Sequence, residues 1–244
     1  MIQKVFKRVE QKYVLNEAQY ISLQELIDTY FAKDKYYDCK IYNIYFDNDN
    51  FDSIINSIEK PKYKSKVRLR SYGQAEKKDN VYLEVKQKYK GVVYKRRINL
   101  TLDEYYKYQK EGIYPDKNKQ IIKEIDYHIK YHNLHPAVFV AYDRLSYYAK
   151  NDKNFRITFD TNLRSRFKNL LLKDTFENEN YFDKKMYIME VKCLNSLPLW
   201  FTNELSKLKI YPSSFSKVGN IYMKERGKEN VREYFTKYNR TIYS

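Results

Sequence analysis

Three neighbouring segments decide the fold: KSKVRLRSY (64–72), NVYLEVKQKY (80–89) and VVYKRRINL (92–100). Each alternates apolar residues with charged or polar ones, which is the pattern of a β-strand that buries one face. A turn at Lys90 and Gly91 separates the second segment from the third, and this predicts a hairpin. The centre of the chain therefore favours hairpin-linked antiparallel strands over parallel strands joined by helical crossovers.

The alternation also sorts the charged residues onto one face of each strand. In KVRLR, Lys66, Arg68 and Arg70 lie opposite Val67 and Leu69, because successive side chains point to opposite sides. The other strands place these residues on their charged faces: Glu84, Lys86 and Lys88; Lys95 and Arg97; Arg8, Glu10 and Lys12; Tyr142, Arg144 and Ser146; Arg156, Thr158 and Asp160; Ile188, Glu190 and Lys192.

Further elements are predicted on both sides of these three segments. Asn16 is placed to cap the first helix, since asparagine is a favoured N-cap. Strands are predicted over 5–15, 41–46, 137–149, 155–164 and 185–193, which makes eight in total. Helices are predicted over 17–33, 51–59, 101–112, 117–133, 198–209 and 217–224. With a loop over 165–183, we expect one α+β domain over residues 1–226 and a basic tail over 227–244.

The composition limits the classes of protein that fit. The chain has 244 residues, with 47 Lys and Arg against 31 Asp and Glu, and a net charge of +16. No apolar run approaches the ~20 residues of a membrane-spanning helix, and the charged N-terminus lacks the apolar core of a signal peptide. Cys39 and Cys193 fit reduced thiols. We therefore expect a cytoplasmic protein, which reaches a membrane only through a partner supplied in trans.

The placement of arginine carries more information than the lysine excess, because Tyr, Lys, Asn and Ile together are typical of an A/T-rich genome. Strands favour β-branched and aromatic residues, so arginine within them needs a reason. Arginines recur in the predicted strands at Arg8, Arg68, Arg70, Arg96, Arg97, Arg144 and Arg156.

Two arrangements satisfy strands that have one apolar and one charged face. In the first, an ordinary sheet turns its charged side to water. In the second, a closed eight-stranded antiparallel barrel has the charges in its lumen, and the amphipathic helices cover its apolar outside. The recurrent arginines favour the second, and so many confined cations call for an anion of comparable charge. Arginine forks match phosphate oxygens, so triphosphate or polyphosphate fits this lumen better than nucleic acid.

The ordered set of segments resembles the VTC domain, the polyphosphate-polymerase branch of the triphosphate tunnel metalloenzymes (CYTH-like superfamily). The resemblance covers about residues 5–225, in the order of the family. The segments that carry it are Glu10–Tyr13 (EQKY), Lys66–Arg70 (KVRLR), Leu83–Lys86 (LEVK), Lys95–Arg97 (KRR), Tyr142–Arg144 (YDR), Arg156–Asp160 (RITFD), Glu190–Lys192 (EVK) and Ser214–Lys217 (SFSK).

The resemblance implies a β-barrel tunnel that transfers the γ-phosphoryl group of ATP to a growing inorganic polyphosphate chain, with Mn²⁺ or Mg²⁺. It assigns phosphate contacts to Lys12, Arg68, Arg70, Lys86, Lys95, Arg144, Arg156 and Lys217, to which the shared face adds Arg97. Of these, Arg68, Arg70, Lys86, Arg144 and Arg156 are the expected catalytic residues. Glu190 matches the metal-binding carboxylate, with Glu10 and Glu84 as weaker second candidates.

One departure bears on the activity. Hydrolases and cyclases of the superfamily have E-x-E-x-K in the first strand, where this chain reads Arg8-Val-Glu10-Gln-Lys12. The missing carboxylate favours a polymerase over a triphosphatase. An inorganic triphosphatase and a non-catalytic binder of polyphosphate or nucleotide remain the alternatives. The pair His128 and His132 has helical i, i+4 spacing but lies away from the charged strands, so we do not expect a metal there.

Overall fold

The computed structural model describes residues 8–90, 92–115, 119–175, 179–180 and 185–225. They form two compact units, each built from separate stretches of the chain. Unit 1 contains residues up to 42, 141–164 and 178–215, and unit 2 contains residues 43–140, 165–177 and those from 216 onward. The start of the first predicted strand, Gly91, the start of the predicted helix at 117, and the predicted basic tail over 227–244 lie outside the described residues.

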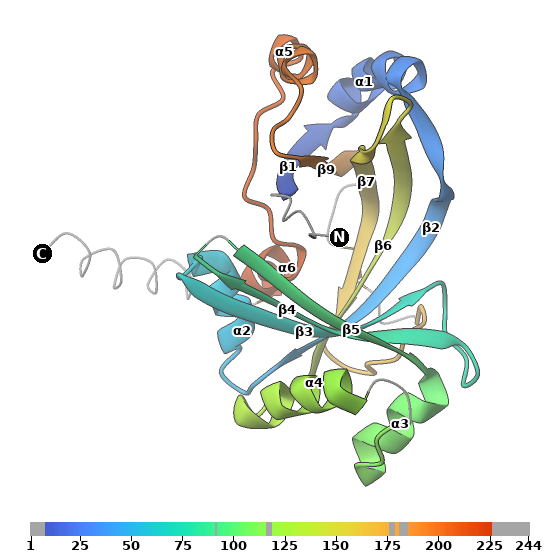
Figure 1. The fold of residues 1–244 in the computed structure, drawn as a ribbon, viewed down its shortest axis with the longest axis vertical. Helices are drawn as coiled ribbons and strands as arrows, with labels where there is room; N and C mark the ends of the chain where they lie inside the picture. Colours follow the sequence, from blue (N-terminus) through green and yellow to red (C-terminus); the bar gives the residue numbers. More distant parts are fainter. Residues whose placement is uncertain (1–7, 91, 116–118, 176–178, 181–184, 226–244) are drawn as a thin grey trace, which may run out of the picture. The chain divides into compact units, whose positions relative to one another are not determined.

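Unit 1 is a sheet with two helices on one face (Figure 1). Its hydrogen-bonded order is β1-β9-β7-β6-β2. The strands are β1 (Arg8–Asn16), β2 (Phe31–Asp47), β6 (His135–Ala149), β7 (Asp152–Arg166) and β9 (Met186–Leu194), with a short β8 (Glu179–Asn180) beside β7. The helices α1 (Glu17–Tyr30) and α5 (Leu199–Lys207) bury their apolar sides against the sheet, where Leu23 and Phe201 belong to one buried cluster with Phe159 and Met189.

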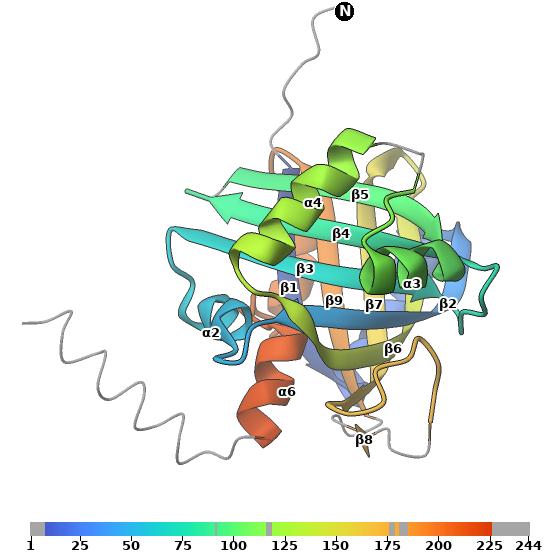
Figure 2. The same ribbon diagram turned by 90° about the horizontal axis from the view of Figure 1, so that it is seen from below.

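Unit 2 is a second set of paired strands, in the order β6-β2-β3-β4-β5. Strands β3 (Tyr63–Tyr72), β4 (Asn80–Tyr89) and β5 (Val92–Thr101) pair antiparallel, with Leu69 opposite Leu83 and Leu83 opposite Ile98. Helices α3 (Leu102–Glu111) and α4 (Lys119–Tyr131) lie along the apolar face of these three strands (Figure 2). Helices α2 (Asp52–Glu59) and α6 (Lys217–Glu225) complete the unit.

The eight long strands, the six helices and the predicted hairpin are confirmed within the described residues. Asn16 caps α1: its side chain accepts a hydrogen bond from the Gln19 backbone N–H at 2.8 Å. The Gln19 side chain accepts one from the Asn16 N–H in return, at 3.2 Å, which forms a capping box.

Three predictions are wrong. Within the described residues the sheet is not a closed barrel: its order is a path that ends at β1 and β5, whereas closure requires the first and last strands to pair. The first helix ends at Tyr30 instead of residue 33, and the strand predicted over 41–46 begins at Phe31. Phe31 adopts an extended backbone (φ −122°, ψ 154°) and buries its ring against Phe155 and Phe201. This burial favours the strand from Phe31 onward, even though the residues that follow are mostly polar.

Candidate functional site: two charged sheet faces

In unit 2, the face of β3, β4 and β5 turned away from α4 contains three rows of side chains. The first row is Lys66, Lys86 and Lys95, which lie opposite one another across the three strands. The second is Arg68, Glu84 and Arg97, and the third is Arg70, Tyr82 and Asn99. The alternation that buries Val67, Leu83 and Ile98 beneath the helices thereby gathers six basic side chains around one carboxylate.

Glu84 is the centre of this face. Its side chain is 2% exposed, and Arg68 Nε donates a hydrogen bond to its Oε2 at 2.7 Å. Its other oxygen forms ion pairs with Lys95 Nζ at 2.9 Å and Arg97 Nε at 3.0 Å. Burial alone would raise the pKa of Glu84, but Arg68, Arg70 and Lys95 outweigh it and lower the pKa to about 2.

Lys95 is one of several cations that share the Glu84 carboxylate. Its own burial lowers its pKa, although Glu84 acts in the opposite direction. The Glu84 carboxylate is therefore shared among Arg68, Lys95 and Arg97. The face stays strongly basic, and it is suited to a multiply charged anion.

Two further residues of this face are held by side-chain contacts: Arg70, which is a predicted phosphate contact, and Lys66, which was predicted only to share its strand face. Buried Arg70 donates from Nε to Asn43 Oδ1 at 2.8 Å, and Asn43 Nδ2 donates to the Val140 carbonyl at 3.0 Å. Lys66 Nζ donates to Ser216 Oγ at 3.3 Å. Ser216 immediately precedes Lys217, the first residue of α6, so this contact ties the helix start to the row of lysines.

Helix α6 approaches α2 closely at its first turn. A Cβ at Gly219 would lie 2.9 Å from Ile58 Cγ1, so only glycine fits without movement. Ser57 and Ser216 hydroxyls also lie 3.1 Å apart, within hydrogen-bond distance. The second half of the SFSK motif, Ser216 and Lys217, is thus placed by close packing of α6 on α2, which its own sequence does not reveal.

Unit 1 has a charged face of its own, opposite the apolar face that α1 and α5 cover. In one row Lys12, Glu190 and Thr158 lie opposite one another on β1, β9 and β7. In the next row Glu10 and Arg156 flank Lys192. Lys192 Nζ pairs with Glu190 Oε1 at 2.5 Å, and Lys12 Nζ donates to the Phe215 carbonyl at 3.4 Å.

Among the described residues of this unit, Arg144 forms the most buried ion pair. Its Nε and Nη2 donate to the two carboxylate oxygens of Asp160 at 2.6 and 2.8 Å, and the Asp160 side chain is 0% exposed. Burial alone would lower the pKa of Arg144, but Asp160 outweighs it and raises the pKa well above the usual value. The fork is therefore permanently charged and rigidly held.

The other predicted residues are less constrained. Arg156 lies on the charged face but is 56% exposed, with its Nη1 3.6 Å from Asp34 Oδ2 and its Nε donating to the Lys153 carbonyl. His128 is buried on the opposite sheet face, where its Nε2 lies 2.9 Å from the Ser65 hydroxyl, so α4 packs against the charged strand β3 instead of lying away from it. Among the described residues, no group of three or more His, Cys, Asp and Glu could hold a metal ion.

The oxygen donors around Glu190 nevertheless suit a hard divalent cation whose remaining ligands come from phosphate and water. Glu190 is 8% exposed, and Thr158 lies directly opposite it on the neighbouring strand. Within the described residues, the buried Thr158 hydroxyl has no hydrogen-bond partner, so it is an oxygen donor with unused capacity. Mg²⁺ needs only one or two protein carboxylates when phosphates and water supply the remaining ligands. Thr158 was not singled out by sequence, although it shares a face with Arg156.

Comparison with known proteins gives the same fold and a family. A solved structure from Bacillus halodurans, described as a candidate adenylate cyclase, aligns with a TM-score of 0.51 at 13% identity, over 86% of this chain and 93% of that one. The likeness shows a shared fold. No helix in the described part of this chain is long and apolar enough to cross a membrane.

The sequence relatives are more specific. The chain is 27% identical over 150 residues to vacuolar transporter chaperone complex subunit 4 of Schizosaccharomyces pombe. The alignment covers 52% of this chain and only 20% of that protein, so the match spans a fifth of the relative's length. The family model described as the VTC domain matches residues 7–224. This chain therefore belongs to the VTC domain family.

Proposed function

We propose that this protein is a polyphosphate polymerase that transfers the γ-phosphoryl group of ATP to a growing inorganic polyphosphate chain. Membership of the VTC family and the likeness to a subunit of the vacuolar transporter chaperone complex support an enzyme of polyphosphate metabolism. The observation that carries the proposal is the face of unit 2, where the strand register places six basic side chains in rows around Glu84. Such an excess of cations suits triphosphate and polyphosphate.

The proposed reaction needs positioning and charge neutralisation more than proton transfer. A terminal oxygen of the polyphosphate attacks the γ-phosphorus in line. A new phosphorus–oxygen bond forms, the bond between the γ-phosphorus and the bridging oxygen breaks, and ADP leaves with the electron pair. The attacking oxygen is already ionised near neutral pH, so no general base is required. In unit 2, Arg68, Arg70 and Lys86 would hold phosphates, assisted by Lys95, Arg97 and Lys217. In unit 1, Arg144 and Arg156 would do so, assisted by Lys12.

Glu190 is the proposed ligand of Mn²⁺ or Mg²⁺, and the Thr158 hydroxyl beside it is a further oxygen donor. Glu10 remains a second candidate, on the same face two residues from Lys12. Glu84 suits a metal least, because both of its oxygens already face cations. When bound, the metal would neutralise phosphate oxygens.

The name of the S. pombe relative places that protein in a complex, and this suggests a partner for the present chain. We propose that the chain acts on the cytoplasmic side and reaches a membrane, if at all, through a membrane-protein partner supplied in trans.

Product analysis tests the proposal. Purified protein is incubated with ATP and Mn²⁺, and ADP, free phosphate and polyphosphate are quantified. Long-chain polyphosphate with equivalent ADP is expected. Free phosphate alone would instead indicate a triphosphatase, and saturable binding without turnover would indicate a binding protein; either result refutes the polymerase.

Three variants and a control identify the residues responsible. Arg68→Ala and Arg156→Ala are expected to abolish product, and Glu190→Gln to abolish either activity or its dependence on metal. Arg96→Ala is the matched control, because Arg96 lies on the opposite sheet face of the same hairpin, where it pairs with Glu124 at 2.7 Å. Full activity in either arginine variant, or an unchanged metal requirement in Glu190→Gln, would refute the assigned roles.

A further inference from the structure

Two tyrosines lie at one end of the charged face of unit 2 and contact one of its cations. The Arg97 guanidinium lies 3.7 Å from the centre of the Tyr82 ring and 5.8 Å from that of Tyr72. Arg97 Nη2 also donates to the Tyr72 hydroxyl at 3.2 Å. The two rings meet edge to face, with centroids 5.5 Å apart. We call Tyr72, Tyr82 and Arg97 the aromatic platform.

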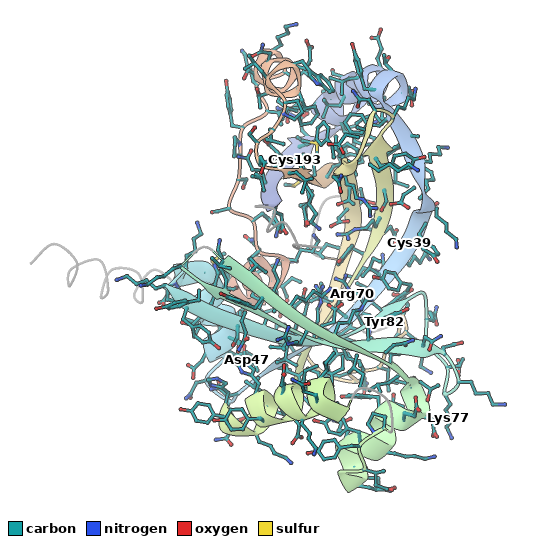
Figure 3. The ribbon with its side chains drawn as sticks, in the orientation of Figure 1. Cys39, Asp47, Arg70, Lys77, Tyr82 and Cys193 are labelled. Carbon is teal, nitrogen blue, oxygen red and sulfur yellow. The ribbon has the colours of Figure 1, made fainter. Side chains whose placement is uncertain are left out.

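The platform is accessible. Tyr72 is 50% exposed and the Arg97 side chain is 34% exposed, although both belong to an ordered set of contacts. Tyr72 has the strand parity of Arg68 and Arg70, so it lies on the charged face and not beneath the helices. Figure 3 places Tyr82 beside Arg70 on the side of the sheet away from α4.

The spacing of the rows relates the platform to the basic side chains. Successive rows lie two residues apart along each strand, or about 7 Å. Tyr72 lies one row beyond Tyr82 on β3, but its hydroxyl accepts a hydrogen bond at 3.2 Å from Arg97 Nη2 of the middle row. The row of Lys66, Lys86 and Lys95 lies about 13 Å from the row that contains Tyr82. This is comparable to the span of an extended nucleoside triphosphate from its γ-phosphorus to its base.

The residue types at the two ends of this span differ in the way that such a ligand requires. The lysine row offers point charges, which suit terminal phosphates. The platform offers one accessible aromatic ring and a guanidinium plane, and both stack on nucleobases. The third row adds the exposed amide of Asn99, which can exchange hydrogen bonds with a base edge. Inorganic polyphosphate alone would gain nothing from the tyrosine rings.

We propose that Tyr72, with Tyr82 and Arg97, forms a nucleobase-binding subsite, which lets this face hold a nucleoside triphosphate with its phosphates on the basic rows. The inference rests on the proposed function, since it presumes that the rows bind phosphate. It adds the feature by which the protein distinguishes a nucleotide donor from an inorganic phosphate chain.

Titration calorimetry with two ligands tests the subsite, using the full chain and either ATP or inorganic tripolyphosphate. Base stacking removed by alanine substitution corresponds to at least about a fivefold change in affinity. Tyr72→Ala is therefore expected to weaken ATP binding at least about fivefold and to leave tripolyphosphate binding unchanged. Tyr72→Phe keeps the ring and loses only the hydroxyl that Arg97 contacts, so it should bind ATP nearly as the wild type does.

Tyr94→Ala is the matched control, because Tyr94 is also exposed but lies on the opposite face of the sheet. It should change neither affinity. Equal weakening of both ligands by Tyr72→Ala would overturn the subsite, since the tyrosine would then act only through Arg97. Unchanged ATP affinity in Tyr72→Ala, or a wild type that binds only tripolyphosphate, would also overturn the subsite. Neither result would contradict phosphate binding by the basic rows. A wild type that binds neither ligand would refute the proposed function itself.

Discussion

Replacing Glu84 by glutamine tests the idea that one buried carboxylate holds the basic face of unit 2 together. The substitution keeps the size of the side chain and removes the charge that Arg68, Lys95 and Arg97 share. The pKa of Glu84 falls from its usual 4.5 to about 2 in the folded protein. Each pKa unit corresponds to about 1.4 kcal/mol, so the ionised carboxylate contributes about 3 kcal/mol to the free energy of unfolding at pH 7.

The pH dependence of this contribution has a definite sign. Because the pKa is lower in the folded state than in the unfolded chain, the stabilisation is complete above about pH 5 and is lost as the pH falls towards 2. We expect Glu84→Gln to be less stable than the wild type by about 3 kcal/mol at pH 7, and the difference to shrink steadily below pH 5.

Urea denaturation of both proteins between pH 7 and pH 3 measures that difference. The matched control is Gln87→Ala, because Gln87 lies on the opposite face of the same strand and the change adds no charge. The reasoning fails if Glu84→Gln loses less than about 1 kcal/mol at pH 7, or if its loss stays constant down to pH 3. Inorganic tripolyphosphate should stabilise Glu84→Gln more than the wild type, because the added anion replaces the missing charge.

Two further predictions concern buried groups in each unit. Asp160→Asn leaves Arg144 without its buried counter-charge, so urea denaturation should show a free energy of unfolding lower by about 3–5 kcal/mol. The double change of Arg144→Met with Asp160→Leu should lower it much less, and equal losses would contradict this reasoning. Burial lowers the pKa of His128 from 6.5 to about 4, with His132 adding to the effect, so the folded protein should lose up to about 3 kcal/mol as the pH falls from 6.5 to 4. His128→Asn should remove that part of the slope in thermal melting, and an unchanged slope would exclude His128 as its source.

Strand alternation alone is enough to predict much of the candidate site. A period of two admits only one way to bury Val67, Leu69 and Leu83, and it places Arg68, Arg70 and Glu84 together on the other face. The capping box at Asn16 is equally local, since it depends on two residues three positions apart. Such features could be predicted because their partners are near in sequence or follow from the pleat.

Features that depend on distant partners could not be predicted in this way. The extension of β2 back to Phe31 depends on Phe155 and Phe201, which arrive from other parts of the chain. Arg144 was expected to contact phosphate, and its pairing with Asp160 depends on how two strands come together. The position of Thr158 opposite Glu190 likewise depends on the register between β7 and β9. The resemblance to a closed tunnel likewise carried no information on whether the end strands of this chain pair.

By itself, then, the sequence determined which residues share a face, because side-chain direction in a strand is a property of the local backbone. It also determined the family, through an ordered set of short motifs. Only the tertiary structure decided which charges neutralise one another: Glu84 became a shared counter-ion, and Tyr72 met Arg97 at the end of the basic rows. The physical reason is that an ion pair or a stacked ring depends on distances of a few ångströms between strands, and these are set by register and packing across the whole sheet.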